Sequence, residues 1–134
     1  MKHSDDLGKL LLRLTIGLLL SMHGLFKLAS GIDSITALVV AQGWPTWVVF
    51  GVFIGEIIAP GLLIIGVLTR VGALVIVVNM GLAIYLAHAA QILKIGNTGG
   101  WALELQGLFL LGALTVALLG AGRFSLGGSH GRLN

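Results

Sequence analysis

Four long apolar stretches dominate the pattern of hydrophobic and polar positions along the chain. They cover approximately residues 7–28, 46–68, 71–93 and 100–121. Because an α-helix rises about 1.5 Å per residue, each stretch is long enough to cross the ~30 Å hydrocarbon core of a bilayer. The pattern therefore predicts an all-α integral membrane four-helix bundle, folded as a single domain over residues 1–134.

The polar breaks between these stretches differ in length. Arg70 alone separates the second stretch from the third, which predicts a tight turn, whereas residues 94–100 contain the glycines and asparagine typical of a loop. The first break is longer and holds a short apolar pattern that begins at Asp33 and ends before Gly43. We expect this break to form a short interfacial helix between the first two spans, with an ordered loop as the alternative.

The basic residues beside the apolar stretches fall into two groups, which predict the orientation of the protein. One end of the predicted bundle carries Lys2, Lys9, Arg70, Arg123 and Arg132, and the other end carries Lys27 and Lys94. Basic residues are enriched on the cytoplasmic side of multi-pass membrane proteins. We therefore expect the N- and C-termini to lie in the cytoplasm.

The composition supports a membrane location and excludes several kinds of chemistry. Hydrophobic residues make up 57% of the chain and charged residues only 10%, whereas soluble domains have about 25% charged residues. The chain has no cysteine, which excludes disulfides, iron–sulfur clusters, zinc–thiolate sites and dithiol exchange built from this chain alone. The net charge of +3 comes from scattered residues, so no nucleic-acid partner is expected.

Three polar residues are predicted to lie deep in the bundle. Glu56 is about ten residues into the second stretch, at a depth of ~15 Å, and Arg13 and Asn79 reach a comparable depth from the first and third stretches. An ionisable residue at the centre of a span costs ~2.5–3.5 kcal/mol, so each needs a partner or a function. We expect a buried Arg13–Glu56 pair assisted by Asn79. This pair either locks the bundle together or leaves Glu56 to handle protons or a ligand.

A second polar layer is predicted near the outer surface, where His23, Lys27, His88 and Glu104 come from three different stretches. Their convergence at one depth predicts a pocket that opens to the outer side. Because imidazole ionises near neutral pH, His23 with Glu104 or His88 is suited to exchange protons with a quinone headgroup. The alternative is structural: Lys27 extends to the lipid headgroups and the other side chains hydrogen-bond between helices.

These two layers supply the predicted site. The candidate catalytic residues are His23 and Glu104, and the candidate ligand-binding residues are Arg13, Lys27, Glu56, Asn79 and His88. A quinone is the favoured ligand. Two histidines on different helices also suit a haem iron, but nothing else in the chain supports haem, and no metal site is expected.

Several short motifs, taken in their order along the chain, resemble those of the DoxX-like family of small membrane proteins. They are Leu-Leu-Leu-Arg13-Leu, His23-Gly-Leu-Phe-Lys27-Leu, Gly55-Glu56, Thr69-Arg70-Val-Gly-Ala, Glu104 and the closing Gly120-Ala-Gly-Arg-Phe-Ser-Leu126. The family usually has an aspartate after the closing motif, where this chain has Gly127, so the role of that aspartate does not carry over. The resemblance covers nearly the whole chain and implies a four-helix protein of a bacterial-type inner (plasma) membrane.

The resemblance also implies a link to redox chemistry. The family takes its name from a subunit of a thiosulfate:quinone oxidoreductase, and some members are linked to oxidative-stress and thiol enzymes. We therefore favour a membrane subunit of a quinone-linked redox system that binds a quinone or similar lipid-soluble molecule; the sequence leaves open whether the chain is itself an enzyme. Two alternatives stay open: a non-catalytic scaffold for a soluble oxidoreductase or larger complex, and a small-solute transporter or sensor, which with four spans would need a homodimer.

Overall fold

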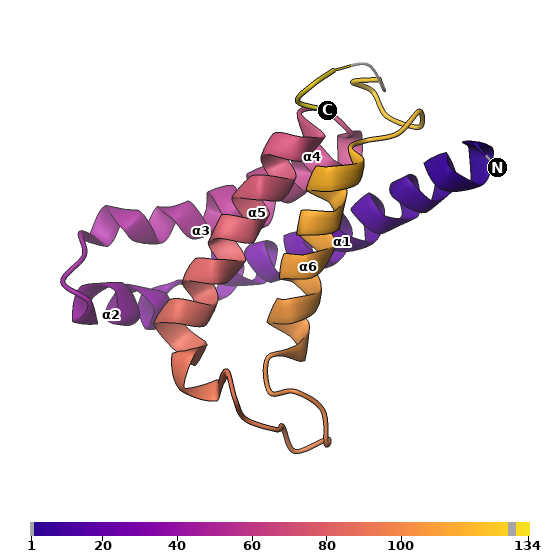
Figure 1. Ribbon diagram of the computed structural model, residues 1–134. Helices are drawn as coiled ribbons and strands as arrows, with labels where there is room; N and C mark the ends of the chain where they lie inside the picture. Colours follow the sequence, from indigo (N-terminus) through magenta and orange to yellow (C-terminus); the bar gives the residue numbers. More distant parts are fainter. Residues whose placement is uncertain (1, 129–130) are drawn as a thin grey trace.

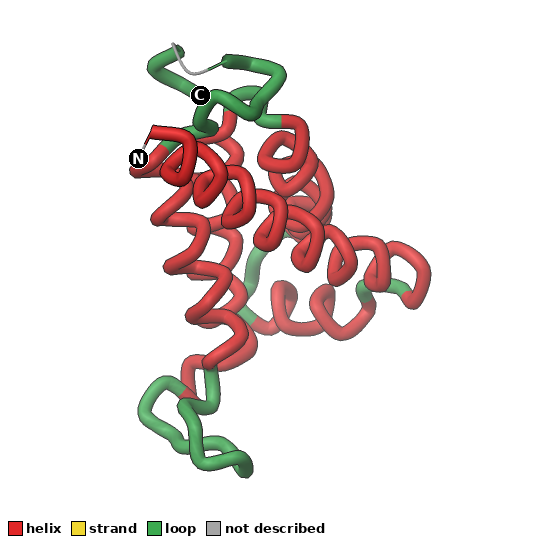
Figure 2. Tube along the Cα trace, turned by 90° about the vertical axis from the view of Figure 1, so that its right-hand side faces the viewer, coloured by secondary structure: helices red, strands yellow, loops and turns green. Residues whose placement is uncertain are grey.

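The computed structural model describes residues 2–128 and 131–134, and these residues form an all-α fold (Figures 1 and 2). The first helix, α1, is followed by the short helix α2, a composite second long helix, a composite third long helix and α6. The bounds are α1 Lys2–Ser30 and α2 Asp33–Ala41; η1 Thr46–Phe50, α3 Gly51–Phe53, η2 Ile54–Ile58 and α4 Ala59–Ile65; α5 Thr69–Ala83, η3 Ile84–His88 and η4 Ala89–Gln91; and α6 Glu104–Leu119.

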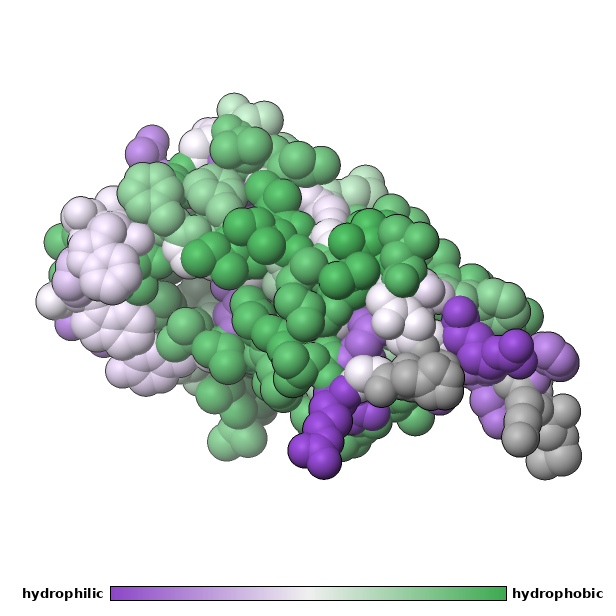
Figure 3. All heavy atoms as spheres, turned by 90° about the horizontal axis from the view of Figure 1, so that it is seen from above, coloured by the Kyte–Doolittle hydropathy of each residue, from purple (hydrophilic) through white to green (hydrophobic). Residues whose placement is uncertain are grey.

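The predicted fold class, an all-α bundle of apolar helices, is confirmed. Among the described residues, three helices are long and apolar enough to cross a membrane, namely His3–Ser30, Thr46–Ile65 and Thr69–Gln91. Large apolar side chains also point outward along the bundle, as Phe26 and Leu118 do, each with 70% of its surface exposed. Figure 3 shows hydrophobic side chains over most of the visible surface, with hydrophilic side chains gathered mainly on one side. Such a surface suits lipid rather than water.

The fourth apolar helix is shorter than the sequence predicts. It begins at Glu104 instead of near residue 100, because the residues before it close into a loop. In that loop the Gly96 amide donates to the Gly100 carbonyl at 2.7 Å, and the Ala102 amide donates to the Lys94 carbonyl at 3.0 Å. The 16 residues of α6 span only ~24 Å.

The segment between the first two long helices forms the expected short helix rather than the alternative, an ordered loop. Its helix, α2, lies between Gly31 at φ 92° and Gly43 at φ 73°. Glycine adopts positive φ at no steric cost, so these two positions turn the chain sharply on either side of α2. The ring of Trp44, just after α2, stacks on Tyr85 of η3 with the ring centroids 6.3 Å apart.

The core lies where α1, α4, α5 and α6 meet. Leu63 on α4, Ala73 and Ile76 on α5 and Ala113 on α6 have no exposed surface. Small side chains allow this close packing, which matters inside a bilayer because lipid offers no hydrophobic driving force between helices. The four helices therefore hold together by close packing in which alanines such as Ala73 and Ala113 alternate with large side chains such as Leu63 and Ile76.

The N- and C-termini lie at the same end of the bundle, which we call the termini face; it carries Asp6, Arg70 and Arg123 (Figure 1). The backbone amide of Arg123 donates to the Asp6 carboxylate at 3.2 Å, and Arg70 Nε donates to the Asn134 carbonyl at 3.1 Å. Asn134 Oδ1 also accepts hydrogen bonds from the backbone amide and the hydroxyl of Thr69. This gives a partner to one of the backbone amides in the first turn of α5 that have none within the helix. The opposite end, with α2 and the loop from residue 92 to residue 103, we call the loop face.

A glycine contact on α1 provides a test of this packing. A Cβ at Gly24 would lie 2.6 Å from the carbonyl oxygen of Glu56, whereas a Cβ at Gly8 would meet no atom within 4 Å. We expect Gly24→Ala to destabilise the protein by about 1–3 kcal/mol, because α1 must move away from η2. Gly8→Ala is the matched control on the same helix, and helix propensity makes it neutral or stabilising by up to ~1 kcal/mol. Thermal unfolding in detergent measures both; equal melting temperatures for the two variants would contradict the close approach.

Candidate ligand-binding cavity

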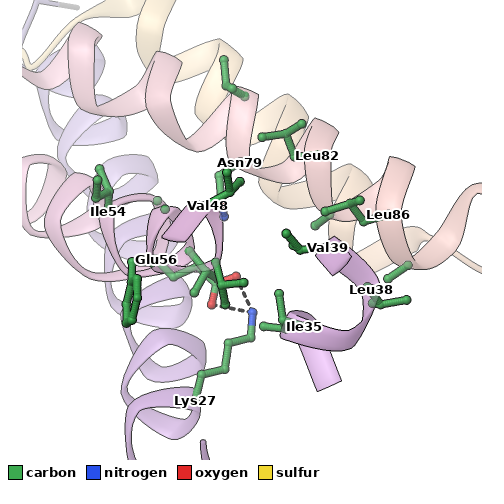
Figure 4. Close-up of a pocket in the computed structure, with 18 of the residues that line it drawn as sticks. Lys27, Ile35, Leu38, Val39, Val48, Ile54, Glu56, Asn79, Leu82 and Leu86 are labelled. Atoms are coloured by element: carbon green, nitrogen blue, oxygen red, sulfur yellow. Dashed lines mark hydrogen bonds and ion pairs between the residues drawn. The ribbon is translucent and has the colours of Figure 1, made fainter. Parts of the chain in front are cut away.

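A cavity of about 960 Å³ lies between α2, the stretch from η1 to η2, and the helix formed by α5 and η3 (Figure 4). Most of its lining is apolar, with Ile35 and Val39 from α2, Val48 from η1 and Leu82 from α5. Its volume is at the upper end of the ~300–1,000 Å³ range of small-molecule sites. The polar groups on its wall are few, so each of them matters for what it can bind.

An ion pair between Lys27 and Glu56 forms the charged part of the cavity wall. Lys27 Nζ lies 2.5 Å from Glu56 Oε1 and 2.7 Å from Oε2, so the ammonium donates to both carboxylate oxygens. The Glu56 side chain is 3% exposed and the Lys27 side chain 30% exposed. A carboxylate this deeply buried is stable only with a hydrogen-bonded partner, and Lys27 supplies both the charge and the hydrogen bonds.

Both composite helices contain a π-helical turn where they border the cavity. Glu56 lies in η2 and His88 lies in η3. A π-helical turn widens an α-helix by one residue, redirects side chains, and is frequent at functional sites. Hydrophobic periodicity does not reveal such a turn, so the sequence could not predict how Glu56 and His88 are aimed.

The Asn79 amide lies on the cavity wall without a hydrogen-bond partner among the described residues. Its Nδ2 atom is buried, and its side chain packs against Gly55, where any Cβ would overlap it. A buried polar group without a partner costs about 1–3 kcal/mol. Asn79 thus holds an unsatisfied donor at the cavity wall; because Nδ2 itself is covered, the side chain must turn before it can donate to a ligand.

His88 lies at the loop-face end of the cavity and links η3 to α6. Its Nδ1 lies 3.3 Å from Gln91 Oε1, and its Nε2 lies 3.3 Å from Gln106 Nε2. The side chain is partly exposed. It therefore connects the cavity wall to polar groups at the surface of the bundle.

The predicted Arg13–Glu56 pair is wrong. Arg13 is 1% exposed, but its guanidinium donates to the carbonyls of Leu63 at 2.9 Å and Ile64 at 3.5 Å, and also to the carbonyl of Phe124. Arg13 precedes Lys27 by 14 residues, which separates them by ~21 Å along α1. Arg13 is thus placed beside the end of α4, whose last carbonyls need donors, and Glu56 is within reach of Lys27 instead.

The two predicted catalytic residues lie outside the cavity. His23 is exposed, its Nδ1 lies 2.9 Å from the Leu19 carbonyl, and its ring packs edge-on against Phe109 at 5.6 Å between centroids. Glu104 is exposed in the first turn of α6. The structure therefore brings together Lys27, Glu56, Asn79 and His88 on one cavity wall, and places Arg13, His23 and Glu104 elsewhere.

Sequence reasoning missed the aromatic and apolar residues of the cavity wall. Trp44, Trp47 and Phe50 border it beside the apolar side chains of α2. Three aromatic residues within seven positions, directly after a short apolar helix, are the signal that could have indicated this wall.

The arrangement defines a small helical membrane protein with an amphipathic cavity between its helices. A comparison with protein-family models matches residues 8–89 to DoxX, so the chain belongs to the DoxX family and is a membrane protein. The matched residues include Lys27, Glu56, Asn79 and His88 and leave out α6. Comparisons with curated proteins and with solved structures gave no significant match.

The ion pair leads to a test by a double-mutant cycle. We expect Lys27→Met to destabilise the protein by about 3–5 kcal/mol, because it leaves the buried Glu56 carboxylate without a counter-charge. Adding Glu56→Gln should recover much of this loss, because the buried charge is then removed as well. Thermal unfolding in detergent gives the coupling, with Lys94→Met in the loop as a surface control. Strictly additive effects of the two substitutions would show that the pair is not coupled.

Proposed function

We propose that this protein binds a quinone, or a similar lipid-soluble molecule with carbonyl groups, in the cavity and acts as a membrane subunit of a quinone-linked redox system. The observation that carries the proposal is the Asn79 amide, which lacks a partner in a largely apolar cavity that also holds the Lys27 ammonium.

The chemistry of the cavity wall suits a quinone ring. A quinone has carbonyl oxygens on a flat apolar ring, and Lys27 Nζ and Asn79 Nδ2 are donors for such oxygens. The indole and phenyl rings of Trp44, Trp47 and Phe50 offer flat apolar surfaces beside them. The remaining aliphatic lining suits the hydrocarbon part of the molecule.

The same wall supplies groups for proton exchange. Glu56 and Lys27 share hydrogen bonds, and His88 lies on the same cavity wall. A carboxylate, an ammonium and an imidazole are the usual side chains for proton transfer in proteins. In this proposal they replace His23 and Glu104 as the groups that exchange protons with the ligand.

We also propose that the chain crosses a bacterial-type inner (plasma) membrane several times, with the termini face in the cytoplasm. The support is the distribution of basic residues: Arg70 and Arg123 lie on the termini face, and the side chain of Lys9 packs near Gly122 on the same face. Cytoplasmic enrichment of Lys and Arg then sets the direction.

Ligand binding is tested with purified protein in quinone-free vesicles. Titration with quinone should quench tryptophan fluorescence, because Trp44 and Trp47 border the cavity. We expect Asn79→Ala to raise the Kd about 5–10-fold through loss of one hydrogen bond. Asn97→Ala, in the loop, is the matched control and should leave the Kd unchanged. The proposal fails if organic extraction of the freshly purified protein yields no quinone and both variants titrate like the wild type.

The orientation is tested with single cysteines, which the cysteine-free chain makes simple to interpret. A membrane-impermeant thiol reagent added to intact cells should label Thr98→Cys on the loop face and leave Arg132→Cys unlabelled until the membrane is opened. Labelling of Arg132→Cys alone in intact cells would reverse the proposed orientation.

A further inference from the structure

The ionisable residues of the cavity lie between its middle, at Glu56, and its loop-face end. Within the described chain, the ionisable side chains on its wall are Lys27, Glu56 and His88. Lys27 lies three residues before the end of α1 at Ser30, and His88 lies three residues before Gln91, so both are close to the loop face. Ser34 of α2 also lines the cavity.

The other arm of the cavity is apolar. It follows α5 from Asn79 toward the termini face past Val78, Val75, Leu74 and Val71, a distance of roughly 12 Å. Among the described residues, no side chain of α4 or of the segment after α6 borders the cavity. In the described chain this arm is bounded by apolar groups only: Val71, Leu74 and Val78 are exposed apolar side chains, as on a lipid-facing surface, and Ala73 and Ile76 on the core side of α5 have no exposed surface.

Arg13 does not open a polar route past these apolar groups. Its guanidinium is bound to the carbonyls of Leu63, Ile64 and Phe124, and the separate small cavity beside it is otherwise lined mainly by apolar residues such as Leu10 and Ile65. Water and protons therefore have no chain of polar groups from the termini face to Glu56 in the described part of the protein.

We infer that the cavity exchanges water and protons with the loop face alone, and that protons are thus a co-substrate drawn from or returned to that face. The route runs past Lys27, whose side chain is 30% exposed and hydrogen-bonded to Glu56. It also runs past His88, which is hydrogen-bonded to Gln91 and Gln106. The other charged groups near this face are Asp33 at the start of α2, Glu104 at the start of α6, and Lys94. The role of the protons rests on the proposed function, whereas the access route does not.

The access route is tested without any ligand, using single cysteines in sealed vesicles of both orientations. Leu86→Cys and Val48→Cys place a thiol on the part of the wall near the loop face, and Leu74→Cys places one in the apolar arm. The cysteine thiolate attacks the thiol reagent, and the thiolate forms in water and not in lipid, so labelling reports contact with water. Thr98→Cys and Arg132→Cys identify the exposed face in each preparation.

We expect an impermeant reagent to label Leu86→Cys and Val48→Cys at least about tenfold faster from the loop face than from the termini face, and to leave Leu74→Cys unlabelled from either face. Faster labelling of Leu86→Cys or Val48→Cys from the termini face would overturn the inference. So would a failure of both to react while Thr98→Cys reacts. If labelling follows the expected pattern but no quinone binds, the proposed function fails and the one-sided access stands.

Discussion

The buried carboxylate of Glu56 is the constraint on which the rest of this structure depends. A charge within an apolar bundle must have a partner, and Lys27 reaches it only because α1 passes close to η2 at Gly24. That close approach fixes how α1 lies against the second long helix. It also places a charged pair at the edge of the cavity rather than in the packed core, where Leu63 and Ile76 leave no room for a polar group.

Much of the fold follows from the apolar pattern, because helices are the simplest way to satisfy every backbone group in lipid. The pattern predicted the four apolar helices and the short helix before the second of them. It overestimated α6, since the glycines and Trp101 that precede Glu104 are apolar enough to extend the pattern yet form a loop closed by their own hydrogen bonds.

The candidate site was less predictable, for a physical reason. Counting residues from the end of a span gives a depth only if the helix stands upright and is regular. The second long helix is not regular, because its backbone changes from 3₁₀ to α to π geometry before α4 begins. Counting therefore predicted that Glu56 pairs with Arg13. In the structure Glu56 pairs with Lys27, and Arg13 donates to carbonyls at the end of α4. Counting did place Lys27, Asn79 and His88 on helices that share a cavity.

The shortness of α6 has a consequence for the surrounding bilayer. At ~24 Å it is shorter than a typical hydrocarbon core of ~30 Å, whereas its neighbour α5 with η3 and η4 is not. Such a hydrophobic mismatch on one flank is relieved by local thinning of the membrane or by interfacial side chains that reach the headgroups. Trp101, whose indole donates to the Ile92 carbonyl, is such an interfacial side chain, in the loop just before α6 begins at Glu104. The protein thus presents apolar helices of unequal length to the lipid around it.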